Sequence, residues 1–217
     1  SSAEVIDVKS HHSDIKEFLL KIEYPRKYKP GSFVQLTLDS VDASSIWPES
    51  RTFSIASYES DKMRFFIKNQ GNYTDRIFNE LKIGSHCTVK FPFGELFDRK
   101  TLDEKHIFLA GGVGITPYFG LIEYFEKVNR LEQISLFYSV KIPEHFIYLD
   151  YLKNKLKENL YIFTTQFTSI DFTNRRIQLK DIKSVASIDD NMYICGNKSF
   201  NHYFKTNLEK LGYQKIH

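Results

Sequence analysis

A glycine-rich turn directly after a short apolar run is the feature that most constrains the fold of this chain. The run at 106–109 has the composition of a buried strand, and it is followed by Gly111-Gly112-Val113-Gly114-Ile115-Thr116-Pro117 and by a helical pattern to about Val128. A buried strand, a turn and a helix in this order are typical of a parallel α/β sheet. Glycines let the backbone turn sharply and approach a ligand closely, because no Cβ stands in the way.

The helix start after this turn is suited to binding a phosphate. Thr116 is well placed as the N-cap, and Pro117 falls in the first turn, where a missing N–H costs nothing. The free N–H groups and the positive end of the helix dipole favour a pyrophosphate, each charge contact contributing roughly 0.3–1 kcal/mol. The glycines do not have the G-x-G-x-x-G spacing of the common dinucleotide fingerprint. A tight turn that binds nothing is the alternative interpretation.

The rest of the second half alternates strand and helix patterns. Strands are expected at 134–140, 160–165 and 192–195, and helical segments at 148–157, 179–182 and 200–211. This alternation predicts a parallel sheet with helices on both faces.

The first hundred residues are rich in short, partly alternating apolar runs. Strands are expected at 17–22, 33–38, 52–57, 64–67 and 87–91, with one helix at 73–81. Turn signals such as Lys29-Pro30-Gly31 separate them, so the pattern predicts a small antiparallel β-barrel. A charged stretch near 99–104 suggests two domains, 1–101 and 102–217, and the length of 217 residues suits two domains of ordinary size.

Composition excludes several classes of function. The net charge of +3 comes without a dense Lys/Arg block, so no nucleic-acid partner is expected. Cys87 and Cys195 are too few for a disulfide framework or an all-cysteine iron–sulfur cluster, and no histidine pair has metal-ligand spacing; His11 and His12 are expected to be surface residues. Apolar runs are too short for a membrane span, and no signal-peptide core is evident, so a cytoplasmic location is expected.

Arg51-Thr52-Phe53-Ser54 opens an otherwise apolar strand in the barrel half. An arginine at the mouth of a strand can clamp phosphate with two hydrogen bonds. The aromatic ring at Phe53 offers a flat surface, and the small Ser54 hydroxyl can donate to a ring nitrogen. The alternative is a plain barrel strand with an exposed arginine.

Two further segments are candidates. Gly71-Asn72-Tyr73-Thr74 precedes the helix of the first half and would form a small anion cradle, or else ordinary helix capping. Tyr193-Ile194-Cys195-Gly196 ends a strand, and ligands bind at the carboxyl ends of parallel strands. The alternative for Cys195 is simple packing.

Taken together and in order, these motifs resemble the ferredoxin–NADP reductase superfamily of flavin enzymes. The likeness runs through Arg51–Ser54, 71–74, Pro92-Phe93-Gly94, 111–117 and 193–196, which covers nearly the whole chain. The resemblance implies a flavin-binding β-barrel followed by a nicotinamide-binding α/β domain, with FAD as cofactor and NADH or NADPH as electron donor.

The resemblance also implies roles for single residues. Arg51 would hold the flavin pyrophosphate, Phe53 would stack on the isoalloxazine where the family often has tyrosine, and Ser54 would hydrogen-bond near flavin N5. Ser54 and Cys195 are the expected catalytic residues, with Cys195 close to the nicotinamide. The expected cofactor-binding set is Arg51, Thr52, Phe53, Ser54, Gly71, Asn72, Tyr73, Thr74, Gly111, Gly112, Gly114, Thr116, Pro117, Lys141, Cys195 and Gly196. No residue is expected to bind a metal.

The chain departs from the family pattern in places. Asn197 and Phe200 stand where the family commonly has proline and, soon after, methionine. The sequence stops at Lys215-Ile216-His217 without the closing aromatic of many members, which implies a trimmed terminus or an open flavin face. Lys141 stands roughly where NADPH-using relatives place an arginine, but the choice between NADH and NADPH stays open, with Gln166, Arg175 and Arg176 as neighbouring positions.

The leading hypothesis is therefore an FAD-dependent NAD(P)H oxidoreductase that passes electrons to a separate acceptor protein, such as a ferredoxin or an oxygenase component. The alternatives are a flavin reductase, which uses free flavin as its substrate and releases it reduced, and a non-catalytic nucleotide-sensing module.

Overall fold

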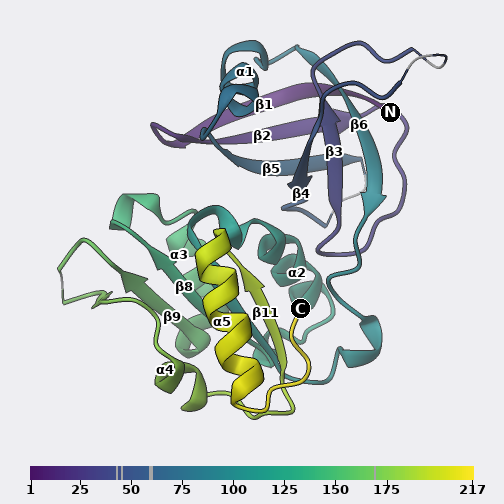
Figure 1. Ribbon diagram of the computed structural model, residues 1–217. Helices are drawn as coiled ribbons and strands as arrows, with labels where there is room; N and C mark the ends of the chain where they lie inside the picture. Colours follow the sequence, from purple (N-terminus) through teal and green to yellow (C-terminus); the bar gives the residue numbers. More distant parts are fainter. Residues whose placement is uncertain (43, 45, 59–60, 169) are drawn as a thin grey trace. The chain divides into compact units, whose positions relative to one another are not determined.

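The computed structural model describes residues 1–42, 44, 46–58, 61–168 and 170–217 of the chain, which divides into two compact units (Figure 1). The first unit contains Ser1–Phe97 together with Thr116–Tyr124, and the second contains Asp98–Ile115 and Phe125–His217.

The first unit is built on a six-stranded sheet in the order β4-β3-β6-β1-β2-β5, and its strand pairs are antiparallel. One helix, α1 (Asn72–Glu80), follows β5. The strands are β1 (Ser2–His12), β2 (Ile15–Ile22), β3 (Phe33–Thr37), β4 (Arg51–Ser54), β5 (Lys62–Lys68) and β6 (His86–Phe93).

The two edge strands of this sheet meet, which closes it into the expected barrel. Just after β4, the Ala56 amide donates to the Arg64 carbonyl of β5 at 2.8 Å. Alternating inward side chains fill the interior, which explains the period of two in the sequence. The interior residues include Val5, Phe18, Leu20, Val34, Leu36, Ile55, Phe65, Ile67, Ile77 and Val89.

The longest strand of the barrel, β1, is not predicted by the sequence pattern. Only Ala3 and Val5 of its residues are buried, and its pairing with β2 shifts register between Val5 and Asp7 and again between Ser10 and His12. Each shift breaks the alternation of inward and outward side chains. His11, expected at the surface, instead lies 2.7 Å from the Glu17 carboxylate with its side chain only 9% exposed.

The second unit is a five-stranded parallel sheet in the order β10-β9-β8-β7-β11, as the alternating pattern predicted. Its strands are β7 (His106–Gly111), β8 (Ile134–Val140), β9 (Leu160–Thr164), β10 (Thr173–Asn174) and β11 (Asn191–Cys195). Its helices are α3 (Leu149–Leu156), α4 (Leu179–Lys183) and α5 (Lys198–Lys210), whereas α2 (Thr116–Lys127) is divided between the two units. Short 3-10 turns lie at Arg99–Thr101, Gly112–Ile115, Leu131–Gln133, Pro143–His145 and Lys157–Asn159.

Helix α5 lies against the sheet beside β11 (Figure 1) and buries Phe204 and Leu208 against Ile107, Leu109 and Met192. After α5 the chain returns along β11, where Ile216 pairs with Met192 in parallel. The very short β10 and this last pairing are not visible in the sequence, because two or three residues carry no periodicity. Among the described residues, no helix has both the length and the apolar character needed to cross a membrane.

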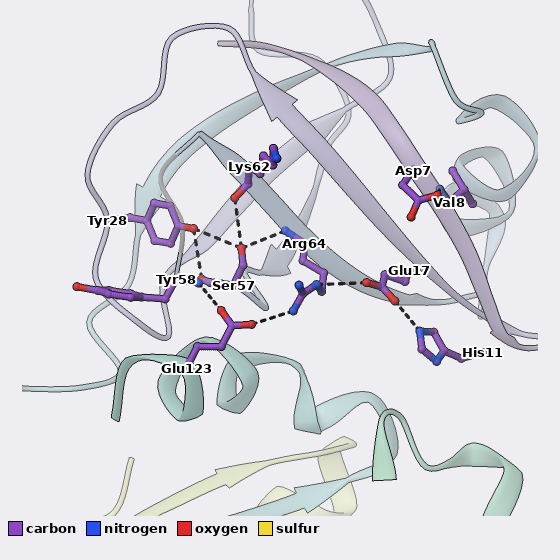
Figure 2. A network of polar contacts seen from close by, with 10 residues as sticks. All are labelled: Asp7, Val8, His11, Glu17, Tyr28, Ser57, Tyr58, Lys62, Arg64 and Glu123. Atoms are coloured by element: carbon purple, nitrogen blue, oxygen red, sulfur yellow. Dashed lines mark hydrogen bonds and ion pairs between the residues drawn. The ribbon is translucent and has the colours of Figure 1, made fainter. Parts of the chain in front are cut away.

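The first nine residues of α2 belong by their contacts to the first unit. A Cβ added at Gly120 would lie 3.0 Å from the Ser57 carbonyl, so the absence of a side chain lets the helix approach the backbone that follows β4. Glu123 then bonds to Tyr58 and Arg64 (Figure 2).

Candidate functional site

In the first unit, Arg51 and the start of α1 lie together. Strand β4 places the Arg51 guanidinium 4.7 Å from the centre of the Tyr73 ring, in the first turn of α1. The Tyr73 ring is buried, and its hydroxyl donates to the Leu36 carbonyl of β3 at 2.9 Å. The helix start is thereby fixed to the barrel, and the arginine is held above it.

The Arg51 charge remains accessible. Its side chain is 50% exposed and pairs with Glu49 two residues earlier at 2.8 Å. An exposed pair of this kind contributes little, of the order of 0–1 kcal/mol. A phosphate with two negative oxygens would compete well for the guanidinium.

The N-terminus of α1 presents backbone donors to the same place. Gly71 is the N-cap and has no side chain that could accept from the helix amides, and its own carbonyl accepts from the Thr74 hydroxyl at 2.9 Å. The amides of Asn72, Tyr73 and Thr74 have no carbonyl four residues earlier inside the helix to pair with. A Cβ built on Gly71 would meet nothing within 4 Å, so the approach is open. Arginine, N–H groups and helix dipole together suit a pyrophosphate.

The remaining residues of the predicted β4 motif differ in burial. Thr52 is exposed, Phe53 is half-buried and packs partly against the barrel core, and Ser54 is half-buried at the end of the strand. Part of the Phe53 ring is therefore available to a ligand, while the rest is fixed by the core. Ser54 pairs with Phe33 of β3, which fixes its backbone.

In the second unit, the glycine turn lies directly against the end of β11. Gly112 has φ of +57°, the left-handed region that favours glycine. A Cβ at Gly114 would lie 2.0 Å from the Cys195 carbonyl oxygen, so no other residue fits there. The structure thus brings together two motifs that lie about eighty residues apart in the chain.

The predicted N-cap role of Thr116 is wrong. A 3-10 turn at Gly112–Ile115 precedes the α-helix, so helical geometry already begins at Gly112. Thr116 is buried inside the continuous helical segment, and Pro117 follows it as the second residue of α2. The helical segment therefore begins within the glycine turn itself and not at Thr116.

Cys195 ends β11 beside this turn and is half-buried. Burial raises the pKa of its thiol to about 11, so the group is a neutral thiol at neutral pH and not a thiolate nucleophile. Cys87 belongs to the barrel core of the first unit, where burial raises the pKa of its thiol to about 12.

The basic residues considered for the choice between NADH and NADPH are not all free of other contacts. Lys141 follows β8 and is exposed, and its carbonyl accepts from the Gln166 amide at 2.9 Å. Arg175 is held by both oxygens of Asp181, at 2.6 and 2.7 Å. Asp181 also completes the capping box of α4 with Gln178, a role that the sequence analysis missed although the spacing of three residues signals it.

Comparisons with known proteins agree with this architecture. Residues 108–206 match the oxidoreductase NAD-binding domain family. The chain is 28% identical over 183 residues to a flavohemoprotein of Candida norvegensis, covering 82% of this chain and 46% of the relative. It is 29% identical over 198 residues to a ferredoxin–NADP reductase of Azotobacter vinelandii, covering 80% of this chain and 75% of the relative.

Among solved structures, the chain is similar to the flavohem-like FAD/NAD-binding domain of nitric oxide dioxygenase from Vibrio cholerae O1 biovar El Tor. The TM-score is 0.84 at 19% sequence identity, and the match covers 100% of this chain and 96% of the other. Several curated relatives are much longer: the chain spans less than half of the Candida norvegensis flavohemoprotein.

The chain thus combines an antiparallel barrel with a parallel sheet, and the unit that holds this sheet contains most of the match to the oxidoreductase NAD-binding domain family. More narrowly, the chain is similar to ferredoxin–NADP reductases, in agreement with the resemblance that its ordered motifs carry.

Proposed function

We propose that this chain is a flavoprotein reductase that takes hydride from NADH or NADPH and passes electrons to a separate acceptor protein. In this proposal residues 1–101 form an FAD-binding domain, and residues 102–217 form an NAD(P)-binding domain. The observation that carries it is the position of Arg51 at 4.7 Å from the ring of Tyr73, at the uncapped start of α1.

The barrel residues fit FAD in charge and shape. Arg51 would bind the pyrophosphate from one side, and the backbone donors of 71–74 would bind it from the helix end. Ser54 would donate to the isoalloxazine near N5, with the accessible part of the Phe53 ring against the flavin. When bound, the flavin supplies an atom that accepts hydride and a ring that can release electrons one at a time.

The second unit fits a nicotinamide dinucleotide. The glycine turn offers backbone donors at the carboxyl end of β7, and Gly114 brings that turn against Cys195 at the end of β11. Gly111, Gly112, Gly196 and the first turn of α2 with Thr116 and Pro117 would border the dinucleotide. The neutral Cys195 thiol would lie beside the nicotinamide as an uncharged neighbour.

A separate acceptor is supported by the cysteine count and by the named relatives. Two cysteines cannot hold an all-cysteine iron–sulfur cluster, so this chain does not supply such a second carrier itself. The Azotobacter vinelandii relative is named for ferredoxin and NADP. A ferredoxin or the terminal component of an oxygenase is therefore the acceptor class we propose.

Anaerobic stopped-flow reduction of the purified chain tests this function, after the bound flavin has been identified by mass. Flavin bleaching by NADH or NADPH, followed by reoxidation with an added ferredoxin, is the expected result. Comparison of the reduction rates with NADH and NADPH decides which dinucleotide is preferred. The exposed Lys141 and the Arg175 bound to Asp181 leave this choice open. A colourless protein that reduces added flavin and releases it would make the chain a flavin reductase. Absence of any diaphorase activity would contradict both the proposed flavoprotein reductase and the alternative flavin reductase.

A further inference from the structure

Phe200, in the first turn of α5, lies over two of the glycines at the carboxyl edge of the parallel sheet. A Cβ added at Gly196 would come within 2.6 Å of Cδ1 of its ring, and a Cβ at Gly111 within 3.2 Å of Cδ2. The two edges of the ring therefore face the ends of β11 and β7. Any side chain at either glycine would collide with the ring or displace it.

These glycines differ from Gly112. A Cβ at Gly112 would meet nothing within 4 Å, so the space beside it is open to a ligand. At Gly111 and Gly196 the missing side chains are replaced by the Phe200 ring. Because Gly111 and Gly196 lack a Cβ, the Phe200 ring can pack at the edge of the sheet where the dinucleotide is proposed to bind.

The ring is held from two further directions. The Phe200 amide donates to the Asn197 side chain at the N-cap of α5, at 2.9 Å. The ring of the buried Phe204 lies behind, with centroids 4.7 Å apart and planes at 60°. Phe200 cannot sink into the core because Phe204 fills it. The ring is only partly buried, so a flat apolar surface remains at the sheet edge.

We propose that Phe200 is a positioning residue for the nicotinamide half of the dinucleotide, whose ring it supports through its accessible surface. The inference rests on the proposed function. Offset or edge-to-face contact between aromatic rings is worth about 0.5–1.5 kcal/mol beyond the buried area. Because the ring is fixed before binding, little conformational entropy is lost when the ligand arrives.

The test compares Phe200→Ala, Phe200→Leu and Phe200→Tyr in the full chain. Affinities for NAD⁺ and NADP⁺ are measured by calorimetry, and those for nicotinamide mononucleotide and ADP by ligand-observed NMR. Phe200→Ala and Phe200→Leu should weaken binding of the preferred dinucleotide and of nicotinamide mononucleotide about three- to tenfold, with ADP unchanged. Phe200→Tyr keeps the ring and should bind like the parent chain.

Two controls separate a local effect from damage to the fold. Tyr203→Ala removes an exposed ring from the same helix and should leave every affinity unchanged. Gly196→Ala should reproduce the loss seen for Phe200→Leu, because the added methyl displaces the Phe200 ring.

Unchanged mononucleotide affinity in both Phe200→Ala and Phe200→Leu would overturn the inference, as would an equal loss for ADP. If the parent chain binds neither dinucleotide, the proposed function fails with it. The two failures are therefore distinguishable.

Discussion

The carboxylate of Glu123 accepts a hydrogen bond from the Arg64 guanidinium at 2.9 Å and another from the Tyr58 amide at 2.9 Å (Figure 2). Arg64 also pairs with Glu17 at 3.2 Å, and Glu17 with His11 at 2.7 Å. Helix α2, which begins after the glycine turn, is thus tied to the barrel by a chain of charged and polar groups. The side chains of Arg64 and Glu123 are about 70% buried.

Glu123→Ala should lower the free energy of unfolding by about 1–3 kcal/mol, because it removes two charge-assisted hydrogen bonds and leaves the Tyr58 amide without this acceptor. Urea denaturation followed by circular dichroism measures the change. Glu126→Ala is the matched control, since Glu126 lies on the same helix in a more exposed pair with Lys155 and should matter less. Equal losses in the two variants would contradict a specific role for Glu123.

Arg51→Ala should weaken FAD binding about ten- to hundredfold, because a charge-assisted bond to phosphate contributes about 1.5–3 kcal/mol. The free energy of unfolding of the flavin-free protein should hardly change, since the side chain is half exposed. Flavin fluorescence during dialysis or titration gives the dissociation constant. Arg130→Ala removes another exposed, ion-paired arginine and should leave flavin affinity unchanged. Full flavin retention in Arg51→Ala would exclude the phosphate-clamp role.

If Ser54 has the proposed role, Ser54→Ala should slow flavin reduction by NADH or NADPH about tenfold or more while sparing flavin content, because it would remove one hydrogen bond near the atom that accepts hydride. Single-turnover stopped-flow kinetics separate this step from dinucleotide binding. The exposed Ser10 of β1 provides a control as Ser10→Ala. A reduction rate equal to that of the parent chain would remove Ser54 from the mechanism.

Sequence reasoning could predict the elements with strong periodicity. Strand β8 begins and ends where expected, at Ile134 and Val140, because its apolar residues and the turn signals on either side indicate the same boundaries. The long β1 could not be predicted, since its two register shifts and mostly polar outward face erase the period of two. Local pattern identifies a strand only while the alternation is unbroken.

Some residues of the candidate site could likewise be identified from the sequence, and others could not. Arg51 and the glycine turn carry their own local chemistry, so the sequence could point to them. The seating of Phe200 between Gly111 and Gly196 could not be predicted, because it depends on how two strand ends and a helix pack together. The bidentate contact of Asp181 with Arg175 could not be predicted either, and it occupies one of the basic residues considered for the choice between NADH and NADPH.

His106 makes the stability of the second unit depend on pH. Its imidazole is fully buried at the start of β7, with Nε2 2.9 Å from the Thr101 carbonyl and Nδ1 3.2 Å from the Tyr193 hydroxyl. The carbonyl only accepts, so Nε2 donates and Nδ1 accepts from the tyrosine in the neutral ring. Burial lowers the pKa of His106 to about 4, from an ordinary value of 6.5.

The unfolded chain therefore binds a proton at His106 below pH 6.5, whereas the folded chain does so only near pH 4. The contribution of His106 to the free energy of unfolding is therefore fully present above pH 6.5. It amounts to roughly 3 kcal/mol and is lost as the pH falls to about 4. Urea denaturation between pH 4 and 7 should show a shallower pH dependence in His106→Gln than in the parent chain. His202→Gln, at an exposed position of α5, should keep the parent dependence. Parallel curves for His106→Gln and the parent chain would show that the buried imidazole does not govern acid stability.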